Sequence, residues 1–266
     1  MSKQNKPTLH PSSIAQFYKL QQCPMYLYHQ YVNEDFGEIS DLQLSPLLSA
    51  TGEAFEASQL DYLLDADIHS IGPEDHQRSF DENWSSSQSN EQQIVESINQ
   101  LVSRNEKESV VFFQPTISGT IGSWPVQGDA DIVIATSDDG ETGPQTVEIC
   151  IAEIKSSSSV KTHHQLQAAI YALLFEKITS DVPIDVSASI VTQDPENNDL
   201  SDIITSTTNI NLQRLHTFEL ETRKNDILLL LEESGKLDQY LLDDGELRDA
   251  DDQPRYRIDN RCDECS

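Results

Sequence analysis

The fold is decided by residues 128–155, which read GDADIVIATSDDGETGPQTVEICIAEIK. Two apolar runs stand in this stretch, at Asp131–Ala135 and at Thr146–Lys155, and both have the character of β-strands. The segment between them, Ser137–Gln145, is polar, contains two glycines and is typical of a turn. We therefore expect two strands joined by a turn.

In the rest of the sequence, some segments have the apolar spacing of a β-strand and others have that of an α-helix. Further strands are predicted at Val110–Gln114, Trp124–Gly128, Ile184–Thr192 and Asp202–Ser206. Helices are predicted at Ile14–Leu20 (capped by Ser12 or Ser13), Cys23–Val32 (with Pro24 in the first turn), Leu47–Leu64, Glu91–Asn105, Gln165–Ile178 and Leu212–Leu242, the last broken near Gly235. This order of helices and strands predicts an α/β or α+β fold without internal repeats.

The charge of the chain is strongly negative. Its 266 residues include 46 Asp and Glu against 17 Lys and Arg, which gives a formal net charge of −29 and a pI near 4.3. Because the acidic residues are spread along the whole chain, we expect a surface adapted to high salt, as in a salt-accumulating archaeon. Counterion release contributes little to DNA binding at such salt, so the negative charge does not exclude a DNA enzyme.

No stretch of the sequence predicts a membrane span or a secretory signal. The longest strongly apolar runs, Val182–Val191 and Ile227–Leu231, are far shorter than the ~18–20 residues that a span needs. Residues 1–11 are polar and lack the apolar segment of a signal peptide. We therefore expect a cytoplasmic protein without a membrane partner.

Two acidic residues and a lysine stand at the ends of the two strands in the opening stretch. Glu153 and Lys155 are two positions apart, so they point to one face of the strand while Ile154 points to the other. If the strands pair as a hairpin, Asp131 lies beside Glu153. Paired carboxylates bind Mg²⁺ or Mn²⁺, and a lysine beside them can orient a water, deprotonate it or neutralise a phosphate, which is the composition of a metal-dependent phosphodiester hydrolase. The alternative is structural, because Glu-x-Lys at a strand end is common in so acidic a chain and Asp131 also suits a turn.

Two predicted helices add polar groups to this set. Gln167 and Tyr171 are four positions apart and share one face of a helix, where they can bond a phosphate or hold Lys155. The alternative is a helix in which Tyr171 merely packs. Glu56, on the predicted helix 47–64, can supply a third carboxylate.

The four cysteines are too few to indicate disulfide bonds in a cytoplasmic protein. Cys262 and Cys265 have the C-x-x-C spacing that lets two thiolates reach one metal centre. Cys150 stands three positions from Glu153, so we expect it on the opposite face of the strand as a small buried residue.

Six short motifs follow one another along nearly the whole chain: Cys23-Pro24, Gly52…Glu56, Gly128…Asp131, Glu153-Ile154-Lys155, Gln167…Tyr171 and Cys262…Cys265. In this order they resemble the RecB-type PD-(D/E)XK nucleases, and within them the iron–sulfur branch that includes the CRISPR-associated exonucleases and the AddB-type nuclease domains. The resemblance implies a restriction-endonuclease-like core, in which helices flank a mixed central sheet. It implies a single nuclease domain over residues 1–266, divided into an N-terminal helical region (1–105), a catalytic sheet core (106–206) and C-terminal helices with the C-x-x-C (207–266).

The resemblance also implies roles for the residues that match. Asp131 and Glu153 would bind Mg²⁺ or Mn²⁺, and Lys155 would be the catalytic lysine. Gln167 and Tyr171 would form the Q-x-x-x-Y motif of the family. Many members have a metal-binding histidine where this chain has Glu56, a departure that leaves the choice of metal open.

A [4Fe–4S] cluster is a further implication of the resemblance. Cys23, Cys262 and Cys265 would be three of its ligands, and the chain offers no fourth cysteine in the expected place. Three explanations stay open: a truncated or split gene product, a cluster with a non-cysteine ligand, or a lost cluster. The end of the chain one residue after the C-x-x-C favours the first.

By this resemblance we expect a metal-dependent deoxyribonuclease, an exonuclease on single-stranded DNA ends in DNA repair, recombination or CRISPR adaptation. The chain has no P-loop motif, so a helicase activity would come from a partner or from a missing downstream region, and a CRISPR adaptation protein is a second expected partner. The alternative is an inactive nuclease-fold module that binds DNA or assists assembly. A third interpretation is an acidic protein-interaction domain.

Overall fold

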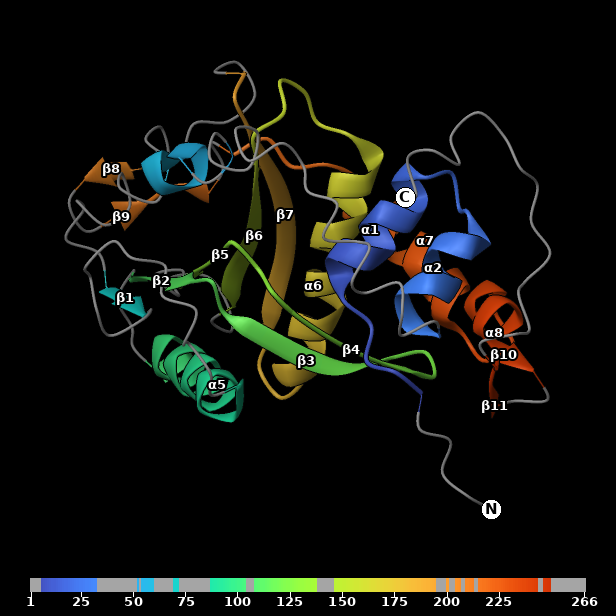
Figure 1. Ribbon diagram of the computed structural model, residues 1–266. Helices are drawn as coiled ribbons and strands as arrows, with labels where there is room; N and C mark the ends of the chain where they lie inside the picture. The colour runs from blue at the N-terminus through green and yellow to red at the C-terminus, as the bar shows by residue number, and fades with distance from the viewer. Residues whose placement is uncertain are drawn as a thin grey trace.

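The computed structural model describes residues 6–32, 52, 54–59, 69–71, 87–103, 108–137, 146–194, 200, 204–206, 209–212, 215–243 and 246–249. Within these ranges the chain is mixed α/β, with helices that flank a mixed central sheet (Figure 1). The α/β class predicted from the sequence is therefore confirmed. No helix in these ranges is long and apolar enough to cross a bilayer.

The central sheet has five strands in the order β1-β2-β5-β6-β7. They are β1 (His69–Ile71), β2 (Ser109–Phe113), β5 (Ile132–Ser137), β6 (Val147–Lys155) and β7 (Ile184–Thr192). β5 is antiparallel to both β2 and β6, whereas β1 with β2 and β6 with β7 are parallel pairs. The two strands of the opening stretch, β5 and β6, thus pair as the sequence predicts.

Both faces of the sheet are buried, which explains why its strands are almost continuously apolar instead of alternating. On β6, Ile149 and Ile151 belong to the hydrophobic core that includes α6. Cys150, Ala152 and Ile154 belong to a second core on the other face. Cys150 is fully buried there, as expected from its position relative to Glu153.

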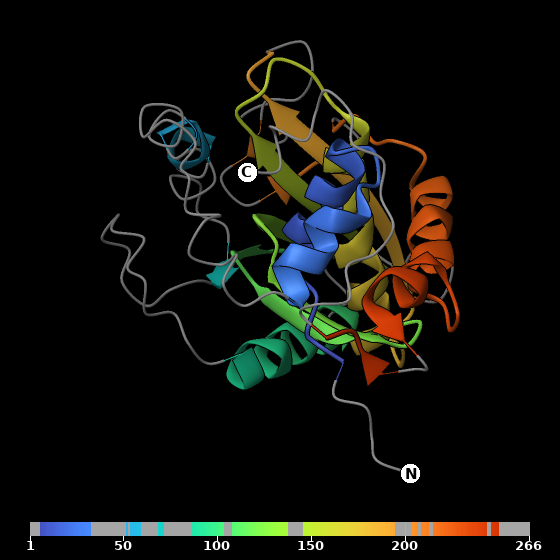
Figure 2. The same cartoon turned by 45° about the vertical axis from the view of Figure 1, so that its right-hand side comes forward.

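The helix α6 (Thr162–Ile178) connects β6 to β7 and covers one face of the sheet (Figures 1 and 2). The sequence predicts an amphipathic helix, but α6 is buried on almost every side, including the whole run 168–175. Two helices from the ends of the chain, α1 (Pro11–Lys19) and α7 (Leu220–Leu231), pack against it. Their contact removes the solvent-facing side that an amphipathic helix would need.

A separate antiparallel hairpin of β3 (Thr116–Ile121) and β4 (Trp124–Asp129) lies beside the central sheet. The sequence pattern predicts β4 but not β3, whose two isoleucines are separated by small polar residues and a glycine. Gly122 forms the turn with a φ of +58°, and a Cβ there would lie 1.9 Å from the Leu231 carbonyl oxygen. Only glycine fits this turn.

The helices before the sheet follow the predictions in most respects. α1 begins at Pro11 after His10, so the predicted cap at Ser12 or Ser13 is wrong; proline suits a first helical position because its missing N–H has no partner to lose there. α2 spans Pro24–Tyr31, and α5 spans Ser87–Ser103. Residues 52 and 54–59 are helical, and the rest of the predicted helix 47–64 lies outside the described residues.

The predicted start of the helix Leu212–Leu242 is wrong. α7 begins only at Leu220, because Thr217 forms a β-bridge with Ser189 and holds the preceding segment against β7. The predicted break near Gly235 is confirmed, since α8 (Lys236–Leu241) starts after it. Short strand pairs complete the described part: β8 (Ile204–Ser206) with β9 (Asn209–Ile210), and β10 (Leu242–Asp243) with β11 (Glu246–Leu247).

Candidate active site

Asp131 and Glu153 lie side by side where β5 begins and β6 ends. The register pairs Ile132 with Ala152, so the residue before Ile132 lies next to the residue after Ala152. The hairpin pairing that the sequence suggests therefore brings the two carboxylates together. They face the same side of the sheet as α6, whereas Ile154 packs in the opposite core.

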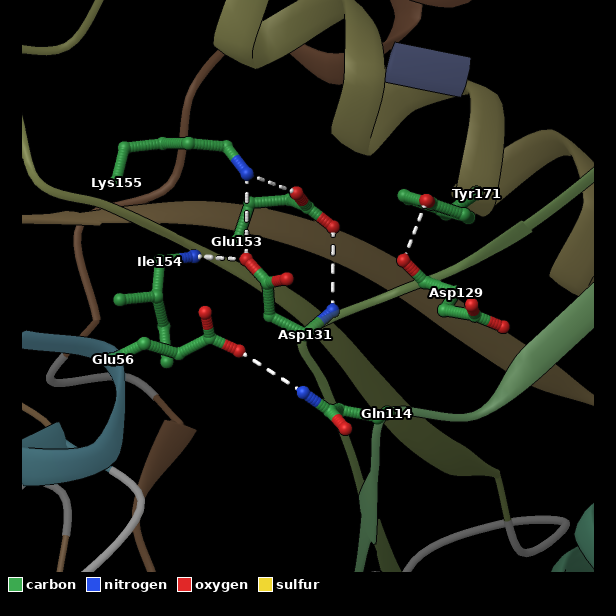
Figure 3. Close-up of polar contacts among 8 residues, drawn as sticks. All are labelled: Glu56, Gln114, Asp129, Asp131, Glu153, Ile154, Lys155 and Tyr171. Carbon is green, nitrogen blue, oxygen red and sulfur yellow. Dashed lines mark hydrogen bonds and ion pairs between the residues drawn. The ribbon is translucent and has the colours of Figure 1, made fainter. Parts of the chain in front are cut away.

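Hydrogen bonds fix this pair in place (Figure 3). The backbone N–H of Ile154 donates to Asp131 Oδ2 at 2.6 Å, and the N–H of Asp131 donates to Glu153 Oε1 at 3.5 Å. Lys155 Nζ donates to Glu153 Oε2 at 2.7 Å and to Asp131 Oδ2 at 3.4 Å. One ammonium group is thus shared by two carboxylates.

Because the site is largely buried, the pKa values of its side chains are strongly shifted. Glu153 is fully buried, and burial together with the charge of Asp131 raises its pKa to about 8, although Lys155 opposes the shift. Burial lowers the pKa of Lys155, but the charges of Glu153 and Asp131 outweigh burial and raise it above its usual value. Lys155 is therefore protonated at neutral pH, and it can orient a water or neutralise a phosphate but not accept a proton.

Glu56 reaches the same site from the helical segment 54–59. Its Oε1 accepts a hydrogen bond of 3.1 Å from Gln114 Nε2, and the backbone N–H of Gln114 donates to the Asp131 carbonyl at 3.0 Å. Figure 3 shows the Glu56 carboxylate directed towards Gln114, on the side of Asp131 away from Tyr171. Gln114 thus links Glu56 to the segment that carries Asp131.

The donor set suits a hard divalent cation. Across the described ranges, no three His, Cys, Asp or Glu side chains form a group that could hold a metal ion. Asp131 and Glu153 alone still fit Mg²⁺ or Mn²⁺, because such ions keep several waters and bind through one or two carboxylates together with substrate phosphates. The role of Glu56 as a third ligand stays a prediction.

A cavity of about 160 Å³ opens next to the carboxylates. It is lined by Gln114, Thr116, Asp129, Ala130 and Asp131. Within it, the Thr116 hydroxyl donates to Asp129 Oδ1 at 2.5 Å. Since Asp131 belongs both to the cavity lining and to the carboxylate pair, a molecule in the cavity reaches Asp131 directly.

The Tyr171 side chain holds the backbone of this cavity instead of facing a substrate. It is 2% exposed, and its hydroxyl donates to the Asp129 carbonyl at 2.6 Å. Burial raises the pKa of Tyr171 well above its usual value, and Gln167 hydrogen bonds to it. The two predicted helix residues thus act together on the end of β4, and in the described part of the chain neither makes a hydrogen bond to Lys155.

The predicted cluster ligands are only partly described. Cys23 is a half-buried free thiol at the N-cap of α2. Cys262 and Cys265 lie outside the described residues, so the predicted [4Fe–4S] site stays a prediction. Burial raises the pKa of the Cys150 thiol to about 12, which agrees with its expected structural place in the core.

Three contributors to the site, Gln114, Thr116 and Asp129, receive no role from the sequence, in which Asp129 is only a spare carboxylate near Asp131. Gln114 has a left-handed backbone with a φ of +45°, and nothing in the segment Phe113–Thr116 marks it as a link to Glu56. Thr116 is on the unpredicted strand β3. Asp129 contributes chiefly its carbonyl oxygen, and a backbone atom leaves no mark in a sequence.

Comparison of the chain with family models, curated proteins and solved structures found no match. The site is therefore defined by its own geometry: a carboxylate pair on adjacent antiparallel strands, a shared lysine and a cavity beside them. These features, on a mixed α/β fold, are those of a candidate metal-dependent catalytic centre.

Proposed function

We propose that the protein is a metal-dependent deoxyribonuclease with a RecB-type PD-(D/E)XK core. One observation carries this proposal: Lys155 Nζ lies 2.7 Å from Glu153 and 3.4 Å from Asp131, and Asp131 lines a cavity. Buried ionisable groups of opposite charge at a cavity are characteristic of catalytic sites. The motif order described above adds the substrate class, which is DNA with single-stranded ends.

The divalent ion is the expected cofactor of this reaction. Asp131 and Glu153 would hold Mg²⁺ or Mn²⁺, which would polarise the scissile phosphate and lower the pKa of a bound water. Its positive charge would also offset the cost of burying two carboxylates next to each other. Glu56 supports the proposal as a third acidic group connected to Asp131 through Gln114.

The other residues of the site bind the phosphate, aim the water and position Asp131. Lys155, which is protonated, neutralises charge on the phosphate and aims the attacking water from the side of Glu153. The backbone N–H of Ile154 fixes one oxygen of Asp131. Tyr171, assisted by Gln167, holds the strand end from which Asp131 projects. Pre-positioning of this kind lowers the barrier because the groups need not be ordered during the reaction.

The broader parts of the proposal follow the motif resemblance. Cys23 would hold a [4Fe–4S] cluster with Cys262 and Cys265, and the free, half-buried thiol of Cys23 is compatible with that role. The protein would act in the cytoplasm of a halophile, as one nuclease domain, in DNA repair, recombination or CRISPR adaptation with a helicase or adaptation partner. An inactive module that binds DNA is the alternative outcome of the test below.

The test compares two glutamates of one strand. Glu153→Gln and Glu148→Gln each replace a carboxyl group of β6 by an amide of the same size, but Glu148 is exposed and Glu153 is fully buried in the site. The proteins are purified without oxygen in molar KCl and incubated with end-labelled single-stranded DNA, with Mn²⁺ or with EDTA. We expect Mn²⁺-dependent cleavage by the wild type and Glu148→Gln, and none by Glu153→Gln. DNA binding without cleavage by the wild type would instead indicate the inactive module.

A further inference from the structure

Basic residues from two helices meet at the N-terminus of α6. Lys161 is the N-cap of this helix, and His163 and His164 belong to its first turn. Lys19 ends α1, whose last turn lies beside the first turn of α6 in both Figure 1 and Figure 2. The loop that leads to this place starts directly after Lys155.

The charge at this place is opposite to that of the chain as a whole. Burial, and after it the charges of His163, Lys155, Lys161 and Lys19, lower the pKa of His164 to about 3. Within the described part of the chain, every charged neighbour that shifts this histidine is thus a cation, although the chain has 46 acidic residues. Three of its nine lysines are in this set.

A buried polar atom at the same place has no partner. His164 is 8% exposed, and its Nδ1 makes no hydrogen bond within the part of the chain that the structure describes. The His164 ring lies 4.3 Å from that of His163, centroid to centroid. Buried polar groups are nearly always paired in folded proteins, so the unpaired nitrogen indicates a missing ligand.

The end of the helix adds to the attraction for an anion. The N-cap Lys161 makes no side-chain hydrogen bond to the first turn. The N-terminus of a helix carries a partial positive charge and presents backbone N–H groups, which together favour phosphate. Without an anion, the lysines and the helix end would repel one another.

We propose that this place binds a phosphate group of the DNA strand, next to the catalytic centre; its members are Lys19, Lys161, His163, His164 and the first turn of α6. The proposal rests on the proposed nuclease function and adds a site to it. At high salt, where non-specific attraction is screened, a local cation cluster of this kind would keep the strand in place. The phosphate is either the monoester at a strand end or a diester within the strand.

The test is DNA binding in EDTA, where no cleavage takes place. Lys19→Gln and Lys161→Gln are compared with Lys177→Gln, which removes the same charge from an exposed lysine in the last turn of α6. Binding of a fluorescent single-stranded oligonucleotide is measured over a range of KCl concentrations. Each variant at the site should reduce the slope of log K against log [KCl] by about 0.7, and Lys177→Gln should leave it unchanged. Equal slopes for all three variants would overturn the proposal.

A second readout reports on the unpaired histidine. In ¹⁵N-histidine NMR spectra, the oligonucleotide should shift the ring signals of His163 and His164, and Lys161→Gln should weaken this shift. Oligonucleotides with a 5′-phosphate and with a 5′-hydroxyl are compared, with inorganic phosphate as the third probe. An effect confined to the 5′-phosphate and inorganic phosphate assigns the site to a strand end, and an equal effect of both oligonucleotides assigns it to an internal diester. Unchanged ring signals with all three probes would overturn the proposed phosphate site.

The outcomes separate this proposal from the nuclease proposal. If Glu153-dependent cleavage occurs but the slopes do not change, the phosphate site is wrong and the nuclease stands. If the slopes change but no cleavage occurs with Mn²⁺, the site stands as a DNA contact and the nuclease is wrong.

Discussion

The Tyr171 hydroxyl donates a hydrogen bond of 2.6 Å to the backbone carbonyl of Asp129, two residues before Asp131. Tyr171 belongs to α6, and Asp129 is the last residue of β4. The bond therefore ties the helix that covers the sheet to the segment that carries Asp131, a candidate catalytic carboxylate. A residue that does not face the cavity thus controls the position of one that does.

Tyr171→Phe should weaken both stability and cleavage. The change leaves the Asp129 carbonyl without its partner, which costs about 1–3 kcal/mol when the group is buried. Because Asp131 is then held less firmly, we expect the rate of Mn²⁺-dependent cleavage to fall by at least about tenfold. Urea unfolding in molar KCl and single-turnover cleavage measure the two effects.

The control for this prediction is Tyr240→Phe. Tyr240 packs against the same core but its hydroxyl makes no described hydrogen bond to the site. It should retain the wild-type cleavage rate. If both variants cleave at the wild-type rate, Tyr171 has no positioning role.

Gly128→Ala should disturb the same contact from the other side. A Cβ at this position would lie 2.7 Å from Pro11 Cδ and 3.0 Å from the Tyr171 hydroxyl oxygen. Because the proline ring cannot turn away, β4 must shift, and overpacking of this kind costs about 1–3 kcal/mol. Gly119→Ala in the same hairpin is the control, since its added methyl meets only the end of the flexible Leu174 side chain. Similar unfolding midpoints for the two variants would contradict the prediction.

Lys155→Met should reduce stability as well as abolish cleavage. Above pH 8, where Glu153 is ionised in the wild type, the change leaves this carboxylate buried without a counter-charge. Loss of one partner of a buried ion pair costs about 3 kcal/mol at the lower end of the usual range. The lower end of this range applies because 22% of the Lys155 side chain is exposed. Adding Glu153→Gln to Lys155→Met removes the unpaired charge and should recover most of the stability but none of the activity. A double variant as unstable as Lys155→Met would show that lost packing, not charge, is the cause.

Mn²⁺ should stabilise the folded protein through the two carboxylates. A ligand that binds only the folded state at about a hundred times its Kd contributes about 2.7 kcal/mol, which raises Tm. We expect this rise for the wild type and for Glu148→Gln, and a much smaller rise for Glu153→Gln. Thermal unfolding with Mn²⁺ and with EDTA tests metal binding without any substrate. An equal rise in all three proteins would place the metal elsewhere.

The central part of the site can be predicted from the sequence because it is local. β5 and β6 are neighbouring apolar runs joined by one turn, so their pairing needs no information from the rest of the chain. The alternation of side chains along β6 then separates Glu153 and Lys155 from Cys150, and the structure agrees. Short-range rules suffice for this much.

The other features of the fold and the site cannot be predicted in this way, because they depend on contacts between segments far apart in the sequence. The burial of α6 on almost every side comes from α1 and α7, which belong to opposite ends of the chain. The partner of Tyr171 is a backbone oxygen, which any residue at position 129 would offer. Residues 215–219 are not helical because Thr217 pairs with Ser189 of β7, and no helix period reveals such a tertiary contact.

His164 should make the stability of the protein fall as the pH falls below about 7. Burial and the nearby cations lower its pKa to about 3 in the folded protein, whereas an unfolded histidine titrates near 6.5. Between these two values the unfolded state binds the extra proton, so the stabilisation present above pH 6.5 is lost as the pH decreases. Relative to His164→Gln, the wild type should lose about 1 kcal/mol between pH 7 and pH 5, after allowance for solvent screening. Urea unfolding at both pH values measures this difference, with the exposed His216 changed to Gln as the control. If His164→Gln loses as much stability as the wild type and the control, the histidine is not held in its neutral form by this cluster.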